Sequence, residues 1–290
     1  MFGFINKVKI FFGGMNVGRI PGVRAVYSAL FEFFRPKKEV IISVRDGRLW
    51  IDPNDKGMAP DLLTYGAYDE FEADILRKHI QPGDVALDIG AHWGYFTLVI
   101  SRLVGETGRV YAFEPDPDNF KLLLKNKELN KLDNVLPERL ALSDKSGQAR
   151  LFLDKSNFGN KSFAKENIPA ADRGGGIDVR TVTLDEYLNG RKIDFIKIDV
   201  QGAEAYVFGG VWETMALYKP RILMEFWPYG LKNSGRNPLE FLKKLENFGY
   251  KFYLMDARTR ELKLKPPEAL VGISRNRPEG HGWANVFCQT

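Results

Sequence analysis

The sequence predicts a doubly wound α/β fold with a mostly parallel sheet. From residue 85 onward, short apolar runs alternate with amphipathic segments, as strands alternate with helices in parallel sheets. The first unit, VALDIGAHWGYFTLVISRLVG, is typical of a buried strand, a glycine turn and a helix. Three predicted strands end in acids, namely Asp88, Glu114 and Asp199. Since ligands of open α/β sheets bind outside the carboxyl ends of the strands, these acids mark a candidate site.

The length and composition are those of an ordinary globular protein. It has 290 residues, 44% of them hydrophobic and 27% charged, which suffices for one large domain with an appendage. The single cysteine excludes an internal disulfide and a cysteine metal cluster. With three histidines, a multi-histidine metal site is not expected.

The N-terminal 36 residues are predicted to form two basic amphipathic helices. Residues 1–48 hold nine Lys/Arg and three Asp/Glu, a net charge of +6, whereas the other 242 residues hold 33 and 34. The helices either pack on the domain as a cap or a homodimer contact, or lie on an anionic membrane surface. Neither a signal peptide nor a transmembrane span is expected, so the predicted location is cytoplasmic, peripheral to the inner membrane face in the second case. Because the body is not basic, nucleic-acid binding is not expected.

A β-hairpin is predicted next, with Asp46-Gly47 as the two-residue turn between alternating runs. The predicted organisation is therefore an appendage over residues 1–58 and a catalytic domain over residues 59–290. Helices are expected at 68–80, 95–103, 118–130, 184–188, 203–217 and 238–248. Strands are expected at 85–88, 109–114, 134–142, 148–153, 178–183, 193–200, 221–226, 250–255 and 283–289. Residues 154–176 are polar and glycine-rich, and are predicted to be a functional loop.

The glycine turn indicates which cofactor class it holds. A dinucleotide fingerprint requires G-x-G-x-x-G, whereas this turn reads D-x-G-x-x-x-G. Trp93 and Tyr95 would crowd a pyrophosphate. An adenosine with a small zwitterionic tail has no such group, and Asp88 can face its ammonium or sulfonium charge. Glu114, at the end of the second strand of the unit, is placed to hold a ribose diol.

Five motifs in order resemble those of the FkbM-type S-adenosylmethionine-dependent methyltransferases. They are DIGAHWGYFTL, YAFEPDPDNFKLLLKN, ALSDKSG, LDEYL and IKIDVQGAE. The resemblance implies a class I methyltransferase fold, Rossmann-like, with a seven-stranded sheet whose last strand is antiparallel. It also implies S-adenosylmethionine under the glycine turn. The implied cofactor-binding residues are Asp88, Gly90, Ala91, His92, Tyr95, Phe96 and Glu114, with Ala141, Leu142 and Ser143 near the adenine.

Two positions depart from the pattern of the family. His92 stands where the family usually has Asn, and Gln201 where it often has Glu. His92 can hydrogen-bond the cofactor carboxylate as Asn would, or act as a base; we favour the first interpretation. With Gln201 neutral, any role for an acid in that loop passes to Asp199 and Glu204.

Asp199 and Glu204 are the predicted catalytic residues. Asp199 ends a main strand, and Lys197, two residues earlier on the same strand face, can pair with it. Glu204 lies in the first turn of the next helix, where simple stabilisation of the helix N-terminus is the alternative role. Asp199 and Glu204 could together bind a divalent cation, but the sequence offers too few further ligands to predict a metal site. Predicted substrate contacts are Tyr68, Glu225 and Trp227, with residues 154–176 and 227–237 as walls.

The function predicted from the resemblance is O-methylation of a hydroxyl on a sugar, a glycan or a secondary metabolite. The acceptor is thus a small molecule or a glycan. One alternative is an NAD(P)-dependent oxidoreductase of Rossmann type, disfavoured by the missing second glycine and by the lack of a Tyr-x-x-x-Lys motif in the second half. The other is a non-catalytic nucleotide-binding scaffold at a membrane surface, disfavoured by the intact acids at all three strand ends.

Overall fold

The computed structural model describes residues 35–273 and 282–290. The two predicted N-terminal helices fall almost entirely within residues 1–34 and so lie outside the described residues. No helix in the two described ranges combines the length and the apolar character that crossing a bilayer requires.

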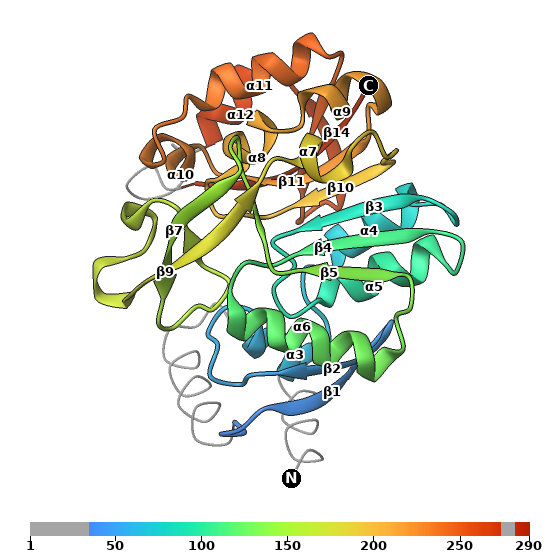
Figure 1. The fold of residues 1–290 in the computed structure, drawn as a ribbon, viewed down its shortest axis with the longest axis vertical. Coiled ribbons are helices and arrows are strands. Elements are labelled where there is room, and N and C mark those ends of the chain that lie inside the picture. The colour runs from blue at the N-terminus through green and yellow to red at the C-terminus, as the bar shows by residue number, and fades with distance from the viewer. Residues whose placement is uncertain (1–34, 274–281) are drawn as a thin grey trace.

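The main sheet has eight strands in the order β13-β12-β14-β11-β10-β3-β4-β5 (Figure 1). The strands from β5 to β11 run parallel, whereas β14 is antiparallel to both of its neighbours, β11 and β12. Seven strands thus follow the predicted arrangement, including the antiparallel last strand. The eighth strand, β13, was not predicted, so the predicted count of seven strands is wrong by one. The bounds are β3 Val85–Ile89, β4 Arg109–Phe113, β5 Val135–Glu138, β10 Phe195–Ile198, β11 Arg221–Phe226, β12 Lys251–Asp256, β13 Glu261–Lys265 and β14 Ala284–Gln289.

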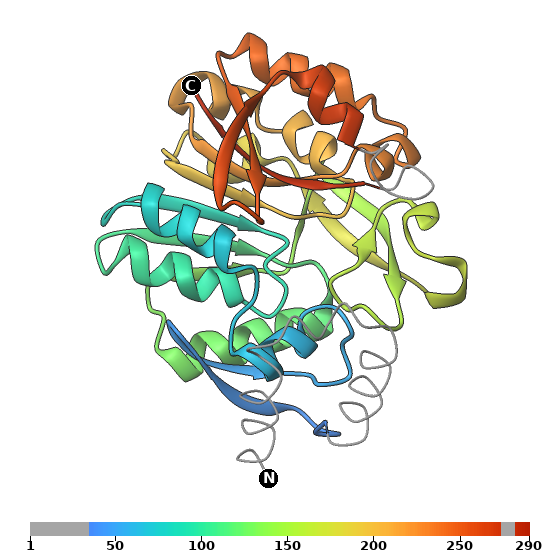
Figure 2. The same cartoon turned by 180° about the vertical axis from the view of Figure 1, so that it is seen from behind.

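Helices cover both faces of the sheet, as a doubly wound fold requires (Figures 1 and 2). Side chains alternate along each strand, so Ala86 packs with one helical layer and Leu87 with the other. The first layer contains α4 Glu70–His79, α5 Tyr95–Val104 and α6 Pro117–Asn130. The second contains α7 Leu184–Leu188, α8 Glu204–Gly209, α9 Trp212–Tyr218, α11 Pro238–Asn247 and α12 Pro267–Gly272. The predicted helix at 203–217 is therefore two helices, separated at Gly210 and Val211.

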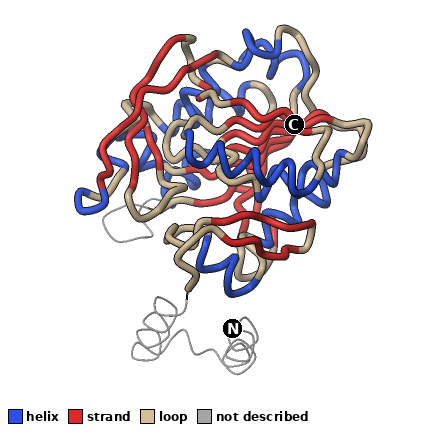
Figure 3. The backbone as a smooth tube through the Cα atoms, turned by 60° about the horizontal axis from the view of Figure 1, so that its bottom comes forward, coloured by secondary structure: helices blue, strands red, loops and turns tan. Residues whose placement is uncertain are grey.

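The predicted hairpin is present as β1 Val40–Val44 and β2 Gly47–Ile51. Because Val44 pairs with Gly47, the turn residues are Arg45 and Asp46, one position earlier than predicted. The hairpin lies against α6 (Figure 3), and Asn126 of α6 bonds both the N–H and the carbonyl of Trp50, at 2.6 and 2.9 Å. A short helix that the sequence did not indicate, α3 Ala59–Tyr65, follows. The described part of the appendage therefore shares one core with α5 and α6.

A second sheet contains the strands predicted at 148–153 and 178–183, together with residues 154, 161–162 and 173–176 of the predicted loop at 154–176. Its order is β6-β9-β7-β8, and it stands beside the main sheet (Figure 1). The strands are β6 Ala141–Leu142, β7 Gly147–Asp154, β8 Lys161–Ser162 and β9 Arg173–Val182. The single strand predicted at 134–142 is accordingly divided between two sheets, as β5 and β6. Pro137 is tolerated in β5 because β5 is an edge strand.

Candidate functional site

The glycine turn after β3 is held against the ends of β4 and β10. Gly90 adopts a φ of 82°, and a Cβ there would lie 1.9 Å from the backbone oxygen of Asp199. A side chain at this position is therefore excluded both by conformation and by space. The N–H groups of Gly90 and Ala91 both donate to the Phe113 carbonyl at 3.0 Å. The predicted strand–turn–helix unit is confirmed, with α5 beginning at Tyr95.

A pocket opens above this turn and runs along the carboxyl ends of β3, β4, β10 and β11. It encloses about 1120 Å³, including its open mouth. Of the residues predicted for the site, eleven line it. They are Tyr68, Gly90, Ala91, His92, Tyr95, Phe96, Glu114, Ala141, Leu142, Asp199 and Glu225.

Glu114 lies in the middle of the pocket with both carboxylate oxygens engaged. One accepts from the Asp116 N–H and the other from the His92 N–H, each at 2.9 Å. Burial raises the pKa of Glu114 to about 7, although nearby Lys161 opposes the shift. Since a carboxylate oxygen has two lone pairs, each oxygen keeps one for a ligand. This geometry suits a ribose diol.

One end of the pocket is apolar and the other is charged. Phe113, Leu140, Ala141, Leu142 and Leu151 line the apolar end, which suits a flat aromatic base.

The charged end contains Lys197, Asp199, Gln201 and Glu225. The Lys197 Nζ lies 3.8 Å from Asp199 Oδ2 and 4.6 Å from the centre of the Phe96 ring. Burial alone would lower the pKa of Lys197, but the carboxylates around it raise it overall. Lys197 is therefore a buried cation that balances part of an acidic site.

Two further acids reach this end from the start of α4. Glu72 is buried, accepts from Asn285 and is hydrogen-bonded to Asp69. Burial, then the neighbouring Asp69, raises the pKa of Glu72 well above its usual value. Burial, then the Asp199 carboxylate, also raises the pKa of Glu225 well above its usual value. Glu72 and Glu225 are therefore harder to ionise than exposed glutamates.

His92 is almost fully buried and has a φ of 51°. Its ring lies 4.5 Å from that of Trp93 and close to the backbone of Phe158, but neither ring nitrogen makes a well-aligned hydrogen bond to any of the described residues. Burial, together with Lys161 and Lys197, lowers the pKa of His92 well below its usual value. A neutral imidazole at a pocket wall has one donor and one acceptor nitrogen and can offer a ring nitrogen to a polar ligand group.

Four predicted site residues do not line the pocket. Asp88 is fully buried beneath it, where it accepts from Thr97 Oγ1 at 2.5 Å. Glu204 is also fully buried and accepts from the Gly202 N–H at 3.0 Å, so it stabilises the start of α8. Ser143 donates to Asp144, and Trp227 packs over Gly230 at the start of α10 Pro228–Asn233.

The segment 154–176, predicted as a wall of the site, contributes Asn157, Gly159, Asn160 and Lys161 to the pocket, whereas Gly57 and Met58 on the N-terminal side were not predicted. Lys161 also pairs with Asp116 at 2.9 Å. The unusual length of the predicted loop was the one available signal for the first group, and nothing in the sequence marks the second.

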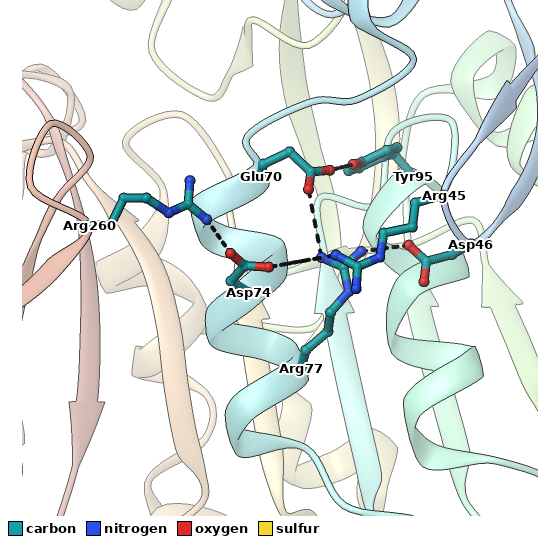
Figure 4. A network of polar contacts seen from close by, with 7 residues as sticks. All are labelled: Arg45, Asp46, Glu70, Asp74, Arg77, Tyr95 and Arg260. Carbon is teal, nitrogen blue, oxygen red and sulfur yellow. Dashed lines mark hydrogen bonds and ion pairs between the residues drawn. The ribbon is translucent and has the colours of Figure 1, made fainter.

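Tyr95, which begins α5, is fixed from outside the pocket by a polar network (Figure 4). Its hydroxyl donates to Glu70 at 3.1 Å. Arg77 lies 3.8 Å from Glu70 and 2.7 Å from Asp46 of the hairpin turn. The network thus connects the hairpin, α4 and the helix that follows the glycine turn.

No group of three or more His, Cys, Asp or Glu side chains in the described ranges is arranged to hold a metal ion. The acids at the charged end are instead held by Lys197, Gln201 and Asn285.

Comparisons with known proteins identify the family to which the chain is similar. A model of the FkbM methyltransferase domain matches residues 88–252. The hexuronic acid methyltransferase AglP of Haloferax volcanii is 27% identical over 146 residues, which are 48% of this chain and 56% of that protein. The methyltransferase sdnD of Sordaria araneosa is 28% identical over 213 residues, 59% of this chain and 82% of that protein. Among solved structures, the methyltransferase FkbM of Methylobacillus flagellatus is 13% identical with a TM-score of 0.41, over 79% of this chain and 52% of that one.

Proposed function

This chain belongs to the FkbM methyltransferase family, with the class I Rossmann-like fold, and from that premise we propose that it transfers the methyl group of S-adenosylmethionine to a hydroxyl oxygen. The observation that carries the proposal is that one pocket joins the glycine turn, Glu114 and Asp199. A nucleoside site and a candidate base therefore share one cavity.

The residues present fit S-adenosylmethionine. Glycine at position 90 lets the end of β10 pack against the turn, because a Cβ there would lie 1.9 Å from the backbone oxygen of Asp199, and Asp199 is thereby held beside the turn. Glu114 would hold the ribose hydroxyls, and the apolar end around Leu142 would hold the adenine. A ring nitrogen of His92 would receive the polar tail. The predicted contact between Asp88 and the tail would be indirect, since Asp88 is buried beneath the pocket.

The cofactor supplies an electrophilic methyl carbon on a sulfonium. The acceptor oxygen gives a lone pair to that carbon, and the electron pair of the carbon–sulfur bond stays on sulfur. The hydroxyl proton passes to Asp199, which lines the charged end of the pocket. Glu204 is not placed for this role because it is buried away from the pocket.

The charged end favours a neutral hydroxyl acceptor, such as a sugar or another polyol. Asp69, Glu72, Asp199 and Glu225 all interact with Lys197, so a carboxylate on the acceptor would add a further acid to a group that already outnumbers this cation. The hexuronic acid named for AglP would therefore be a poorer acceptor here than a neutral sugar.

Calorimetry with S-adenosylmethionine and with NADH tests the cofactor. We expect S-adenosylmethionine to bind and NADH not to bind; NADH binding alone would establish the oxidoreductase alternative instead. Methyl-labelled cofactor with neutral sugars, uronic acids and polyketide alcohols then tests the acceptor. Mass spectrometry should find the label in an ether, whereas a methylamine product would refute O-methylation. Binding without turnover on any acceptor would favour the scaffold alternative.

Asp199→Asn tests the base. General-base catalysis contributes about 10²–10⁴-fold, so kcat should fall by that factor while the affinity for S-adenosylmethionine is retained. Turnover that survives the substitution would place the base elsewhere.

A further inference from the structure

The side chain of Gln201 connects two carboxylates of the charged end. Its Nε2 donates to Asp199 Oδ1 at 2.7 Å and to Glu225 Oε1 at 2.8 Å. A primary amide nitrogen has two protons, and here each is directed to a different acid. Asp199 Oδ2 lies 3.8 Å from Lys197 Nζ, beyond hydrogen-bond distance, and so stays available to an acceptor proton.

The backbone of Gln201 is fixed as firmly as its side chain. The residue has a φ of 50°, which is uncommon outside glycine. Its carbonyl accepts from Ser162 Oγ at 2.9 Å and from Asn167 Nδ2 at 3.2 Å. The next residue, Gly202, has a φ of 89°, and a Cβ there would lie 2.6 Å from the backbone of Gly230. The second sheet and α10 thus determine where the Gln201 amide points.

The surroundings of the bridge are strongly acidic. Titratable groups face it from β3, β10, β11, α8 and the start of α4. They are Asp88, Lys197, Asp199, Glu225, Glu204, Tyr68, Asp69 and Glu72. A further acid at position 201 would add negative charge to this cluster, whereas the neutral amide of Gln201 supplies hydrogen-bond donors without adding charge.

We propose that Gln201 is a positioning residue of the methyl transfer, whose carboxamide ties Asp199 to Glu225 and holds Asp199 Oδ2 toward the acceptor. The inference rests on the proposed function, in which Asp199 receives the hydroxyl proton. Gln201 itself contacts the carboxylates and exchanges no proton.

The bridge can be tested before an acceptor is known. In ¹⁵N NMR spectra, the side-chain amide of Gln201 is identified by its absence in Gln201→Glu, which has no side-chain NH₂ group. Gln201→Asn keeps an amide but is one methylene too short to reach both acids. We expect the Gln201 resonance to change with pH as the acids titrate, and to shift in Glu225→Gln, which replaces one of its acceptors. A pH-independent resonance at the position of a solvent-exposed amide would overturn the proposal.

The catalytic consequence is tested with an acceptor from the panel above. Gln201→Asn should lower kcat by about 10- to 100-fold, as misplacement of a reacting group by about 1 Å does. Gln201→Glu should move the acidic limb of the kcat profile to higher pH by about 1 unit or more, since it adds a carboxylate to the cluster. The KM for S-adenosylmethionine should stay unchanged in both. Gln148→Glu makes the same chemical change at an exposed position of β7 and should alter neither quantity.

An unchanged pH profile in Gln201→Glu overturns the proposal. So does a fall in kcat that is matched by loss of cofactor binding and by a lower Tm, because a structural role would then suffice. If the native chain does not bind S-adenosylmethionine, the proposed function fails, while the NMR measurement still decides whether the bridge exists.

Discussion

Glu114 sets how the proposed cofactor binding depends on pH. Its pKa is raised to about 7 by burial, and ribose hydroxyls donate to the ionised form. As the pH falls through 7, the carboxylate takes up a proton that binding must displace. The affinity for S-adenosylmethionine should therefore fall toward about tenfold per pH unit in the acid range.

Glu114→Gln removes both the charge and this pH dependence. Hydrogen bonds to a charged group contribute about 1.5–3 kcal/mol, so the Kd for S-adenosylmethionine at pH 8 should rise by about 10- to 100-fold. Calorimetry between pH 5.5 and 8.5 measures both effects. If the Kd for S-adenosylmethionine depends on pH in the same way in the native chain and in the variant, Glu114 does not contact the cofactor.

Glu204 should affect stability rather than chemistry. Burial raises its pKa to about 8, and one carboxylate oxygen has no hydrogen-bond partner in residues 35–273 and 282–290. The folded state thus keeps a proton that the unfolded chain releases near its usual pKa of 4.5. The stability that Glu204 contributes is therefore complete below that value, is lost as the pH rises toward 8, and changes no further above it.

Glu204→Gln should flatten this dependence. Between pH 5 and 8 the difference is at most about 4 kcal/mol, from 1.36 kcal/mol per pKa unit. Urea unfolding at the two pH values measures it, with Glu213→Gln on the exposed side of α9 as the matched control. If Glu204→Gln and Glu213→Gln lose the same stability between pH 5 and 8, Glu204 is ionised in the folded state.

The sequence placed Gly90, Glu114 and Asp199 at one site, and the structure brings them to one pocket. It did not reveal that Asp88 and Glu204 lie beneath that pocket. A strand end specifies where an acid lies along the strand, but the face to which its side chain points depends on register with the neighbouring strands. Asp88 shares a face with Ala86, in the layer covered by α5.

At the scale of elements, the segment between β7 and β8 covers the pocket because Asp55 anchors it. Asp55 Oδ1 accepts from the Phe158 N–H at 2.7 Å, and Oδ2 accepts from the Met58 N–H at 2.7 Å. The N–H groups of Gly57 and Ala59 also donate to the Asp55 carboxylate, at 3.1 and 3.2 Å. One buried carboxylate thus joins two segments that both line the pocket.

Asp55→Asn should loosen this cover. An amide has a single acceptor oxygen, so its NH₂ group would face backbone N–H groups, at a cost of about 1–3 kcal/mol in stability. Hydrogen exchange should become faster over residues 155–163, and S-adenosylmethionine should bind more weakly. Asp133→Asn makes the same change at an exposed turn and should alter neither. Unchanged exchange in Asp55→Asn would mean that other contacts hold the segment.

The elements that the sequence predicted are those with strong internal patterns. The main strands, α5 and α11 carry periodic apolar residues, whereas the missed elements depend on pairing with distant segments. Residues 173–176 include three glycines, yet they belong to β9 because β7 pairs with them. Likewise, β13 forms at the sheet edge through its pairing with β12. Pairing across many residues leaves little local signal.

At the scale of the whole molecule, the pocket draws on more of the chain than the family match covers. Gly57, Met58 and Tyr68 line it, yet they precede residue 88, where the match begins. The hairpin before them also packs into the core of the helical layer that holds α5 and α6. The predicted boundary at residue 58 therefore does not separate two cores in residues 35–273.

Leu49→Ala tests whether the hairpin is part of the folding unit. Leu49 is fully buried in β2, and truncation of a buried leucine costs about 2–5 kcal/mol. If hairpin and sheet unfold together, the midpoint of the main transition in urea should fall, and the free energy of unfolding derived from it should decrease by about 2–5 kcal/mol, whether followed by tryptophan fluorescence or by circular dichroism. Leu217→Ala removes the same atoms from a side chain that is 69% exposed and should leave the transition in place. A main transition that is unmoved in Leu49→Ala, preceded by a small separate one, would instead make the hairpin an independent appendage.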